Sequence, residues 1–203
     1  FSGEFEADSI EVRFTYELQT SPKSFVTITY KVNPCGTLKV TEDYKKVEGL
    51  GDLPSFGMLF TIPKEFKKIK FYGFGPKDNY IDRCEGARLG TFETNIFEEI
   101  EPYLMPQESG NHCGVRWFKV VDERGRGLKF FGTPFEVSAL PNSPHEFENA
   151  RHQEELPPHK FTFVKISSQN CGVGGDDSWG SPTLDEYKIR NEDKHFEFCI
   201  KGI

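Results

Sequence analysis

The sequence predicts a mainly β fold, a large antiparallel sandwich of two sheet layers with one or two short helices. Apolar and polar residues alternate with a period of two in one segment after another, which is typical of strands. The 20 Phe and 7 Tyr against only 2 Met favour a pleated, half-buried surface. Gly, Pro, Asn and Asp fill the connections. A length of 203 residues most simply makes one domain, residues 1–203.

The alternation is clearest in residues 25–32, which predicts a strand with one buried face and one wet face. Its apolar members are Val26, Ile28, Tyr30 and Val32, and its polar members are Thr27, Thr29 and Lys31. About a dozen strands is large for an immunoglobulin-type sandwich and favours a bigger double layer. The same period predicts strands over residues 10–18, 37–40, 58–62, 68–72, 115–121, 128–131, 135–139, 161–166 and 196–200.

One helix is predicted after Ser143. The run Ser143-Pro144-His145-Glu146 places a capping residue, a proline at the first helical position and a glutamate at the third, which is a capping box. The run Leu156-Pro157-Pro158 ends the helix. Between them, Phe147 and Ala150 give an apolar side that we expect to lie against a sheet.

Charge and cysteine usage exclude several classes of function. The net charge is −7 and no basic stripe is present, so nucleic acid is not expected as a partner. No apolar run is long enough to span a membrane. Five widely spaced cysteines without a C-x-x-C pair argue against a disulfide framework and a zinc ribbon. We expect buried free thiols in a reducing compartment, with no metal or cofactor in this chain.

Two polar segments could carry chemistry. Residues 72–83 are rich in glycine, but no helix follows to receive a phosphate and Pro76 removes an N–H donor, so a structural turn is the stronger interpretation. In residues 103–112, Glu108 is a candidate acid and His112 a candidate base. Neither has a partner at a fixed spacing, so a polar loop packed between strands is the stronger interpretation.

The most informative segment is Gly172-Val173-Gly174-Gly175-Asp176-Asp177-Ser178-Trp179. Gly172, Gly174 and Gly175 permit tight turns, and the acids and the serine can bond to the backbone and fix the loop. Adjacent carboxylates would repel phosphate, and their side chains diverge too far to share calcium. The loop therefore predicts a sugar platform, with Trp179 for stacking and Asp176, Asp177 and Ser178 beside it. A buried structural tryptophan is the alternative.

Taken in order, these segments resemble the C-terminal domain of glycoside-hydrolase-family-2 β-galactosidases, which forms much of the small chain where that enzyme is split. The resemblance is clear from about Phe71 to the end. It is carried by five segments in the family's order, which are residues 73–83, 103–111, 115–117, 150–156 and 172–179.

The resemblance implies a sandwich of the galactose-mutarotase-like kind and a truncated C-terminal domain of a larger enzyme. It implies that Trp179 stacks on the non-galactose (aglycone) part of a β-galactoside or lactose-like sugar. The acid/base and nucleophile glutamates of the family lie on a (β/α)₈ barrel that no part of this chain resembles. No catalytic residue is therefore carried over, and the chain alone is expected to be inactive.

The parent is expected to be a cytoplasmic homo-oligomer in which this chain contacts the remaining domains. Secretion stays an alternative, because residue 1 is Phe and the start of the parent is absent. Three other functions also stay open. They are a stand-alone carbohydrate-binding module, a purely structural assembly domain, and an epimerase on the same sandwich that would use a carboxylate and one of His112, His152, His159 or His195.

Overall fold

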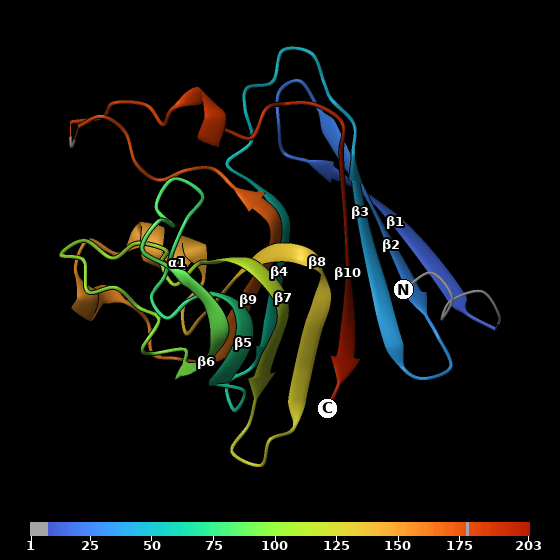
Figure 1. Cartoon of the computed structure of the whole chain (residues 1–203). Helices are drawn as coiled ribbons and strands as arrows, with labels where there is room; N and C mark the ends of the chain where they lie inside the picture. The colour runs from blue at the N-terminus through green and yellow to red at the C-terminus, as the bar shows by residue number, and fades with distance from the viewer. Residues whose placement is uncertain (1–7, 178) are drawn as a thin grey trace.

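The computed structural model describes residues 8–177 and 179–203, and within them it confirms a mainly β, antiparallel fold with few helices (Figure 1). Every strand pairing is antiparallel. The strands are β1 (Ile10–Leu18), β2 (Ser24–Val32), β3 (Thr37–Tyr44), β4 (Ser55–Pro63), β5 (Lys68–Gly75), β6 (Arg88–Asn95), β7 (His112–Val121), β8 (Gly127–Leu140), β9 (Phe161–Asn170) and β10 (Lys194–Gly202). The helices are α1 (Pro144–Asn149) and two 3₁₀ turns, η2 (Gln153–Glu155) and η3 (Asp185–Tyr187).

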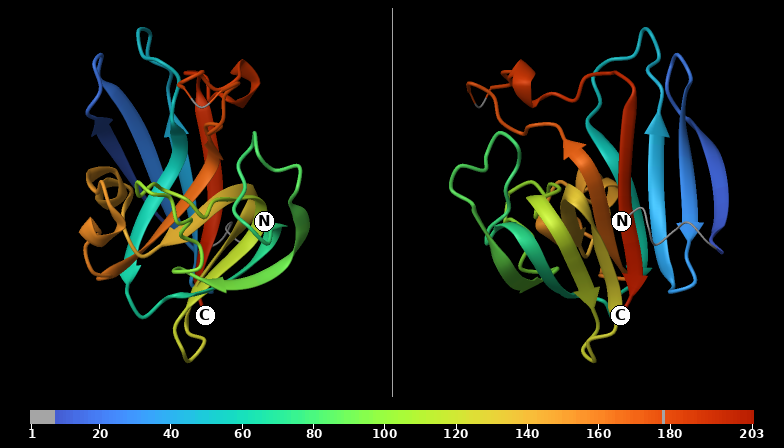
Figure 2. Two further views of the ribbon diagram at one scale, coloured as in Figure 1. Left: turned by 90° about the vertical axis from the view of Figure 1, so that its left-hand side faces the viewer. Right: turned by 45° about the vertical axis from the view of Figure 1, so that its right-hand side comes forward.

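The long strand β8 creates two layers from one continuous sheet. Its first part pairs with β10, and β3, β2 and β1 follow outward from β10 in that order. Its last part pairs with β9, and β4 follows β9. The sheet therefore divides at β8. Strands β9 and β4 form a second layer, which faces the layer formed by β10, β3, β2 and β1 (Figure 2). Strands β7, β5 and β6 continue the sheet on the other side of β8.

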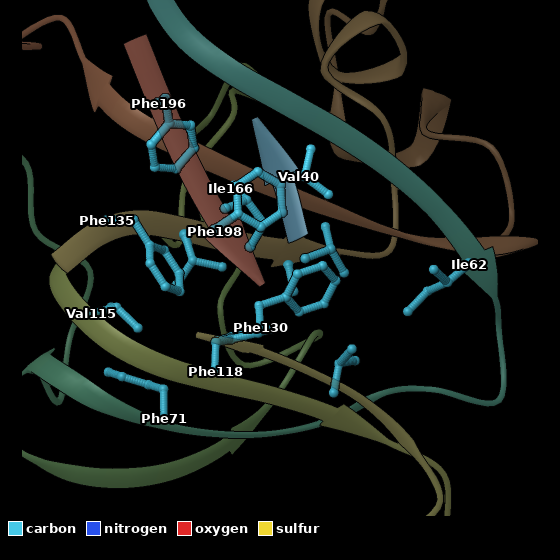
Figure 3. Packing of buried hydrophobic residues seen from close by; sticks show 14 of the residues in the cluster. Val40, Ile62, Phe71, Val115, Phe118, Phe130, Phe135, Ile166, Phe196 and Phe198 are labelled. Atoms are coloured by element: carbon cyan, nitrogen blue, oxygen red, sulfur yellow. The ribbon is translucent and has the colours of Figure 1, made fainter. Parts of the chain in front are cut away.

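A phenylalanine-rich core fills the space between these layers (Figure 3). The ring of Phe60 on β4 lies 5.5 Å from that of Phe130 on β8 and 6.1 Å from that of Phe198 on β10. Phe130 and Phe118 are 0% and 1% exposed. These contacts between the layers confirm that the aromatic composition serves a sheet core, where large flat side chains supply much of the buried area.

The strand predictions are confirmed with two exceptions. Residues 128–131 and 135–139 belong to the single strand β8, in which the exposed Pro134 lies where the strand changes from one partner to the other. A proline is tolerated there because no ladder hydrogen bond needs its missing N–H. Strand β6 was not predicted, since its sequence RLGTFETN alternates weakly and it pairs only with β5 among the described strands.

The helix prediction is right at its start and wrong at its end. Ser143 accepts a bond from the N–H of Glu146 at 3.2 Å, and Glu146 accepts one from the N–H of Ser143 at 2.7 Å. The α-helix ends at Asn149 instead of continuing to Leu156, and only η2 follows. Phe147 and Ala150 are buried, at 1% and 5% exposed, so one short turn already places the apolar side.

The prediction of buried thiols is wrong for most of the cysteines. Cys199 is buried, three others are half-buried and Cys35 is exposed, and none of the five, all of which lie in the described part of the chain, forms a disulfide. Cys35 lies in the turn between β2 and β3 and is exposed there. The helices of the described residues are too short or too polar to cross a membrane.

Candidate functional site

The loop predicted as a sugar platform connects β9 to β10 and extends from one end of the sheet (Figure 1). Trp179 is 90% exposed, so it is not a buried structural tryptophan. Gly174, Gly175, Asp176 and Asp177 are exposed beside it. Ser178, which was predicted to contact substrate, lies outside the described residues. The loop thus presents a large flat ring to its surroundings.

Asp177 fixes the backbone that carries this ring. Its Oδ1 accepts hydrogen bonds from the backbone N–H groups of Trp179 at 2.7 Å and Ser181 at 3.3 Å. The bond from Trp179 is the main reason why the pKa of Asp177 is lowered. A carboxylate that accepts two N–H bonds from residues two and four positions ahead closes a tight turn. The predicted role of an acid in shaping the loop is therefore confirmed at Asp177.

Two of the three predicted loop glycines are required by close packing, and none of the three has a positive φ. A Cβ on Gly172 would lie 2.7 Å from Oδ2 of Asp82, and a Cβ on Gly175 would lie 2.3 Å from the carbonyl oxygen of Ser181. A Cβ on Gly174 would meet only Oδ2 of Asp82, at 3.3 Å. Steric exclusion of a side chain, and not the left-handed backbone expected of a turn, explains Gly172 and Gly175.

Asp82 anchors the loop to the segment 72–83. Its Oδ2 accepts a 2.7 Å hydrogen bond from the backbone N–H of Gly174. The base of the loop is held separately, by bonds from the N–H of Gly172 to the carbonyl of Tyr187 and from the hydroxyl of Thr183 to the carbonyl of Gly172, both 2.9 Å. Two motifs that lie about 90 residues apart in the sequence are thus one structural unit.

Asn79 joins segment 72–83 to the end of segment 103–112 and to Cys113 directly after it. Its amide donates to the carbonyls of Phe74 at 3.0 Å and Lys77 at 3.1 Å, and its Oδ1 accepts from the N–H of Cys113 at 2.9 Å. The backbone of Asn79 exchanges further bonds with Asn111. Asn79 is 1% exposed, so these bonds satisfy an amide that would otherwise be buried at a large cost. Segment 72–83 is accordingly a structural turn.

A buried polar cluster, Asn111, Glu136 and Asn170, lies beneath the base of the loop. Oε2 of Glu136 accepts from the amides of Asn111 at 3.0 Å and Asn170 at 2.7 Å. Burial raises the pKa of Glu136. Asn170 is the last residue of β9 and the loop begins directly after it. The cluster therefore fixes the position at which the loop leaves the sheet.

A groove of about 550 Å³ runs beside the loop. Val173 lines it together with Tyr80, Asn111, Lys165 and Asn170. Glu108 also lines it, where its Oε1 accepts a 2.8 Å bond from Nζ of Lys165. The walls of the groove are more apolar than polar, its polar lining residues can bond to the hydroxyl groups of a sugar, and Trp179 is not among the residues that line it.

The candidate acid and base of segment 103–112 do not form a catalytic pair. His112 is 2% exposed, its Nε2 lies 2.7 Å from Oε2 of Glu99, and its ring centroid lies 4.2 Å from that of Phe71. Glu108 is engaged instead with Lys165. His112 is a core residue that orders the loop around Glu99, which agrees with the interpretation of this segment as a polar loop packed between strands.

Of the other histidines, His152, His159 and His195 do not line the groove, whereas His145 lines it together with Glu108. His195 is exposed and its Nδ1 lies 2.7 Å from Oδ1 of Asp43. His159 packs against Phe97, with ring centroids 5.2 Å apart, and His152 is exposed. No group of three or more His, Cys, Asp or Glu side chains with the arrangement of a metal site occurs among the described residues.

Sequence reasoning missed Asp82 as the anchor of the loop, and it missed the buried cluster. No local signal identifies Asp82, because its partner Gly174 is distant in the sequence. Glu136 does carry a signal, since a charged residue stands within the run Phe135–Leu140, which is buried on both faces. Such a residue needs buried partners.

Comparison with known proteins assigns nearly the whole chain to one family. Residues 2–200 match the family model described as beta galactosidase small chain. A beta-galactosidase of Streptococcus thermophilus is 42% identical over 203 residues, which is 98% of this chain and 20% of that protein. A beta-galactosidase small subunit of Latilactobacillus sakei is 34% identical over 213 residues, which is 98% of this chain and 66% of the subunit.

The chain thus spans about a fifth of the length of the long relatives that it matches. Among solved structures, a putative aldose 1-epimerase of Escherichia coli K12 aligns with 95% of this chain and 65% of its own, at 10% identity and a TM-score of 0.42.

Proposed function

The chain belongs to the family of beta-galactosidase small chains, and on that premise we propose that it supplies the aglycone-side wall of the active site in a β-galactosidase. The parent enzyme would hydrolyse terminal, non-reducing β-D-galactosides such as lactose. Trp179 would stack on the sugar or ring that follows galactose. In this proposal the chain also provides scaffold contacts to the rest of the enzyme.

The observation that carries the proposal is an exposed tryptophan on a fixed backbone. Trp179 is 90% exposed, yet Asp177 holds its N–H and Asp82 holds the N–H of Gly174. An exposed indole ring offers a large flat apolar face on which a ligand can stack. Fixing the loop in advance lowers the entropy that binding must overcome. Both features fit a stacking platform.

The polar residues of the loop are assigned two different roles, which are shaping the loop backbone and forming hydrogen bonds with the sugar. Asp177 uses Oδ1 on the loop backbone, so we assign to it mainly the positioning of Trp179. Asp176 is exposed next to it and, with Ser178, is assigned to hydrogen bonds with aglycone hydroxyls. Carboxylates accept strongly from sugar hydroxyls, and each such bond adds orientation to the stacking of the ring.

The chemistry of hydrolysis is assigned to polypeptide outside this chain. A glycosidase of the usual kind needs two carboxylates at a defined separation across the glycosidic bond. The buried carboxylate of Glu136 is enclosed by Asn111 and Asn170, and Glu108 is paired with Lys165. We therefore propose that the catalytic pair lies on a separate barrel. We further propose that the parent enzyme is cytoplasmic and that it is a homo-oligomer in which this chain contacts the remaining domains.

The test uses Trp179→Ala in the complete enzyme. We compare kcat/KM for a galactoside with a ring aglycone and for methyl β-galactoside, which has almost no surface on which to stack. One stacking contact is worth about 1–3 kcal/mol, so kcat/KM for the ring substrate should fall about 5- to 150-fold. The methyl galactoside should change little, because the galactose subsite lies elsewhere.

Two controls separate stacking from general damage. Trp179→Phe keeps an aromatic face and should retain most of the preference for the ring substrate. Leu104→Ala removes another exposed apolar side chain, which is 96% exposed, and should affect neither substrate. Equal loss for both galactosides in Trp179→Ala, or no loss for either, would contradict the proposed role.

A further inference from the structure

Strand β1 carries an apolar face that no described residue covers. Residues Ile10, Val12, Phe14, Tyr16 and Leu18 alternate with polar residues and so share one face. They are between 37% and 71% exposed, although strands with this alternation normally bury the apolar side. The prediction that this segment forms a strand is confirmed, while its expected burial is not.

The same face is buried one strand further in. Phe14 is paired with Ile28 and Tyr16 with Val26, and Ile28 and Val26 are only 4% and 8% exposed. Residues of β4 line one groove together with Val26 and Ile28 of β2 and with only the last residues of β1, so β4 lies near β2 and leaves most of β1 exposed. A groove of about 340 Å³ marks this boundary, with Tyr16, Leu18 and Val26 on one side and Phe56 and Met58 on the other.

The second layer also ends in a free edge at that point. Strand β4 pairs with β9 and with no other described strand. Its outer edge therefore presents backbone N–H and C=O groups that can template a further strand. Sheet layers pack about 10 Å apart and neighbouring strands about 4.8 Å apart, so a strand added to β4 would lie over β2 and β1.

A buried carboxylate in the groove lacks a partner. Glu42 on β3 lines the groove and is 5% exposed, and its Oε2 accepts no hydrogen bond from the described residues. Its neighbours Val40 and Tyr44 on the same face are core residues, so Glu42 points into the space between the layers. A buried unpaired oxygen is costly, which calls for a donor from the missing side.

We propose that one amphipathic β-strand from the part of the small-chain polypeptide outside residues 1–203 pairs with the free edge of β4, covers the apolar face of β1 and gives Glu42 a hydrogen-bond donor. The choice of this occupant rests on the family membership of the chain and on the parent enzyme that the proposed function assumes. The chain covers 66% of the small subunit of Latilactobacillus sakei, so about a third of that subunit lies outside the match. Alternating apolar residues and one Lys, Arg or hydroxyl residue opposite Glu42 are its expected pattern.

Photo-crosslinking identifies the occupant directly. The complete enzyme is made with p-benzoylphenylalanine at Tyr16 on the apolar face, or at Thr15 on the opposite face as the matched control, then irradiated and analysed by peptide mass spectrometry. The proposal predicts that position 16 crosslinks to a peptide of the small-chain region outside residues 1–203, with at least tenfold less of that product from position 15.

Every other result of the crosslinking overturns the proposal. A product with residues 1–203 of a second copy identifies self-association, a product with the region that carries catalytic activity identifies another domain, and no product leaves the face open to water. None of these readouts depends on catalysis, so the stacking role of Trp179 can fail while the crosslink forms, or the reverse.

A pair of substitutions gives an independent measurement. Phe14→Lys places a charge on the apolar face and Thr15→Lys places the same charge on the wet face. In the 203-residue chain, where Phe14 is 48% exposed, both variants should unfold within about 2 °C of the parent chain. In the complete enzyme, Phe14→Lys alone should lower Tm, by at least about 5 °C. Equal Tm values for the two variants in the complete enzyme contradict a covered face.

Discussion

Gly175→Ala, compared with Gly174→Ala, tests whether the shape of the loop sets the position of Trp179. A Cβ at position 175 would lie 2.3 Å from the carbonyl oxygen of Ser181, roughly 1 Å closer than ordinary contact allows. The atom in the way belongs to the backbone, so the two sides of the loop must separate by a similar distance. A Cβ at position 174 meets one carboxylate oxygen at 3.3 Å, which small side-chain movement accommodates.

The expected cost follows from this geometry. Overpacking of this size costs about 1–3 kcal/mol, and here it is relieved by opening the loop, because the 3.3 Å bond from Ser181 to Asp177 is the weakest restraint. Trp179 then loses its defined position. Misplacement of a positioning group by about 1 Å can cost on the order of 100-fold in rate, which sets the upper limit of the effect.

The assay is kcat/KM of the complete enzyme for a galactoside with a ring aglycone. Gly175→Ala should lower this value about 5- to 100-fold while the value for methyl β-galactoside stays nearly constant. Gly174→Ala should change neither by more than about twofold. The reasoning is refuted if the two alanine variants behave alike, or if Gly175→Ala lowers both substrates equally.

Three further predictions concern the anchor, the core and a buried acid. Asp82→Ala removes the acceptor of the Gly174 N–H, worth about 1–2 kcal/mol, so hydrogen exchange at Gly174 should accelerate about 5- to 30-fold while Tm changes little; unchanged exchange contradicts the anchor. Phe130→Ala leaves a cavity between the layers and should lower the free energy of unfolding by about 3–5 kcal/mol in urea titration, whereas the exposed Phe97→Ala should cost less than about 1 kcal/mol. Burial raises the pKa of Glu42 from 4.5 to about 7, so the folded 203-residue chain keeps a proton that the unfolded chain releases. The stability from Glu42 is therefore fully present below pH 4.5 and is lost as pH rises through 7, by about 3 kcal/mol in urea unfolding, and Glu42→Gln should abolish this slope.

The strands that the sequence predicts best are those whose burial is local and one-sided. Residues 25–32 alternate cleanly because β2 has a core face and a wet face, and the capping box fixes the start of α1 within one residue. Strand β8 was divided at Pro134, since the change of partner from β10 to β9 has no local signature. The exposure of β1 depends on where β4 ends, which alternation cannot reveal.

The composition of the loop predicts an exposed aromatic platform and acids that bond to the loop backbone. The structure shows such a bond at Asp177, which accepts from the N–H of Trp179. The contacts that hold the loop in place were not predictable, because the bond from Gly174 to Asp82 and the bonds of Asn170 to Asn111 and Glu136 join residues that are distant in the chain. The partner of His112 was not predictable for the same reason. This partner, Glu99, lies in a loop whose path only the fold determines.

The partition of the galactosyl group between glucose and water tests the stacking role of Trp179 most directly. It compares two acceptors at one common intermediate, so defects in earlier steps cancel. In the complete enzyme, Trp179→Ala should lower the ratio of transfer to hydrolysis about 5- to 150-fold at fixed glucose concentration, and Trp179→Phe should restore most of it. An unchanged ratio in Trp179→Ala, with glucose still accepted as in the unmodified enzyme, would contradict a wall formed by this chain.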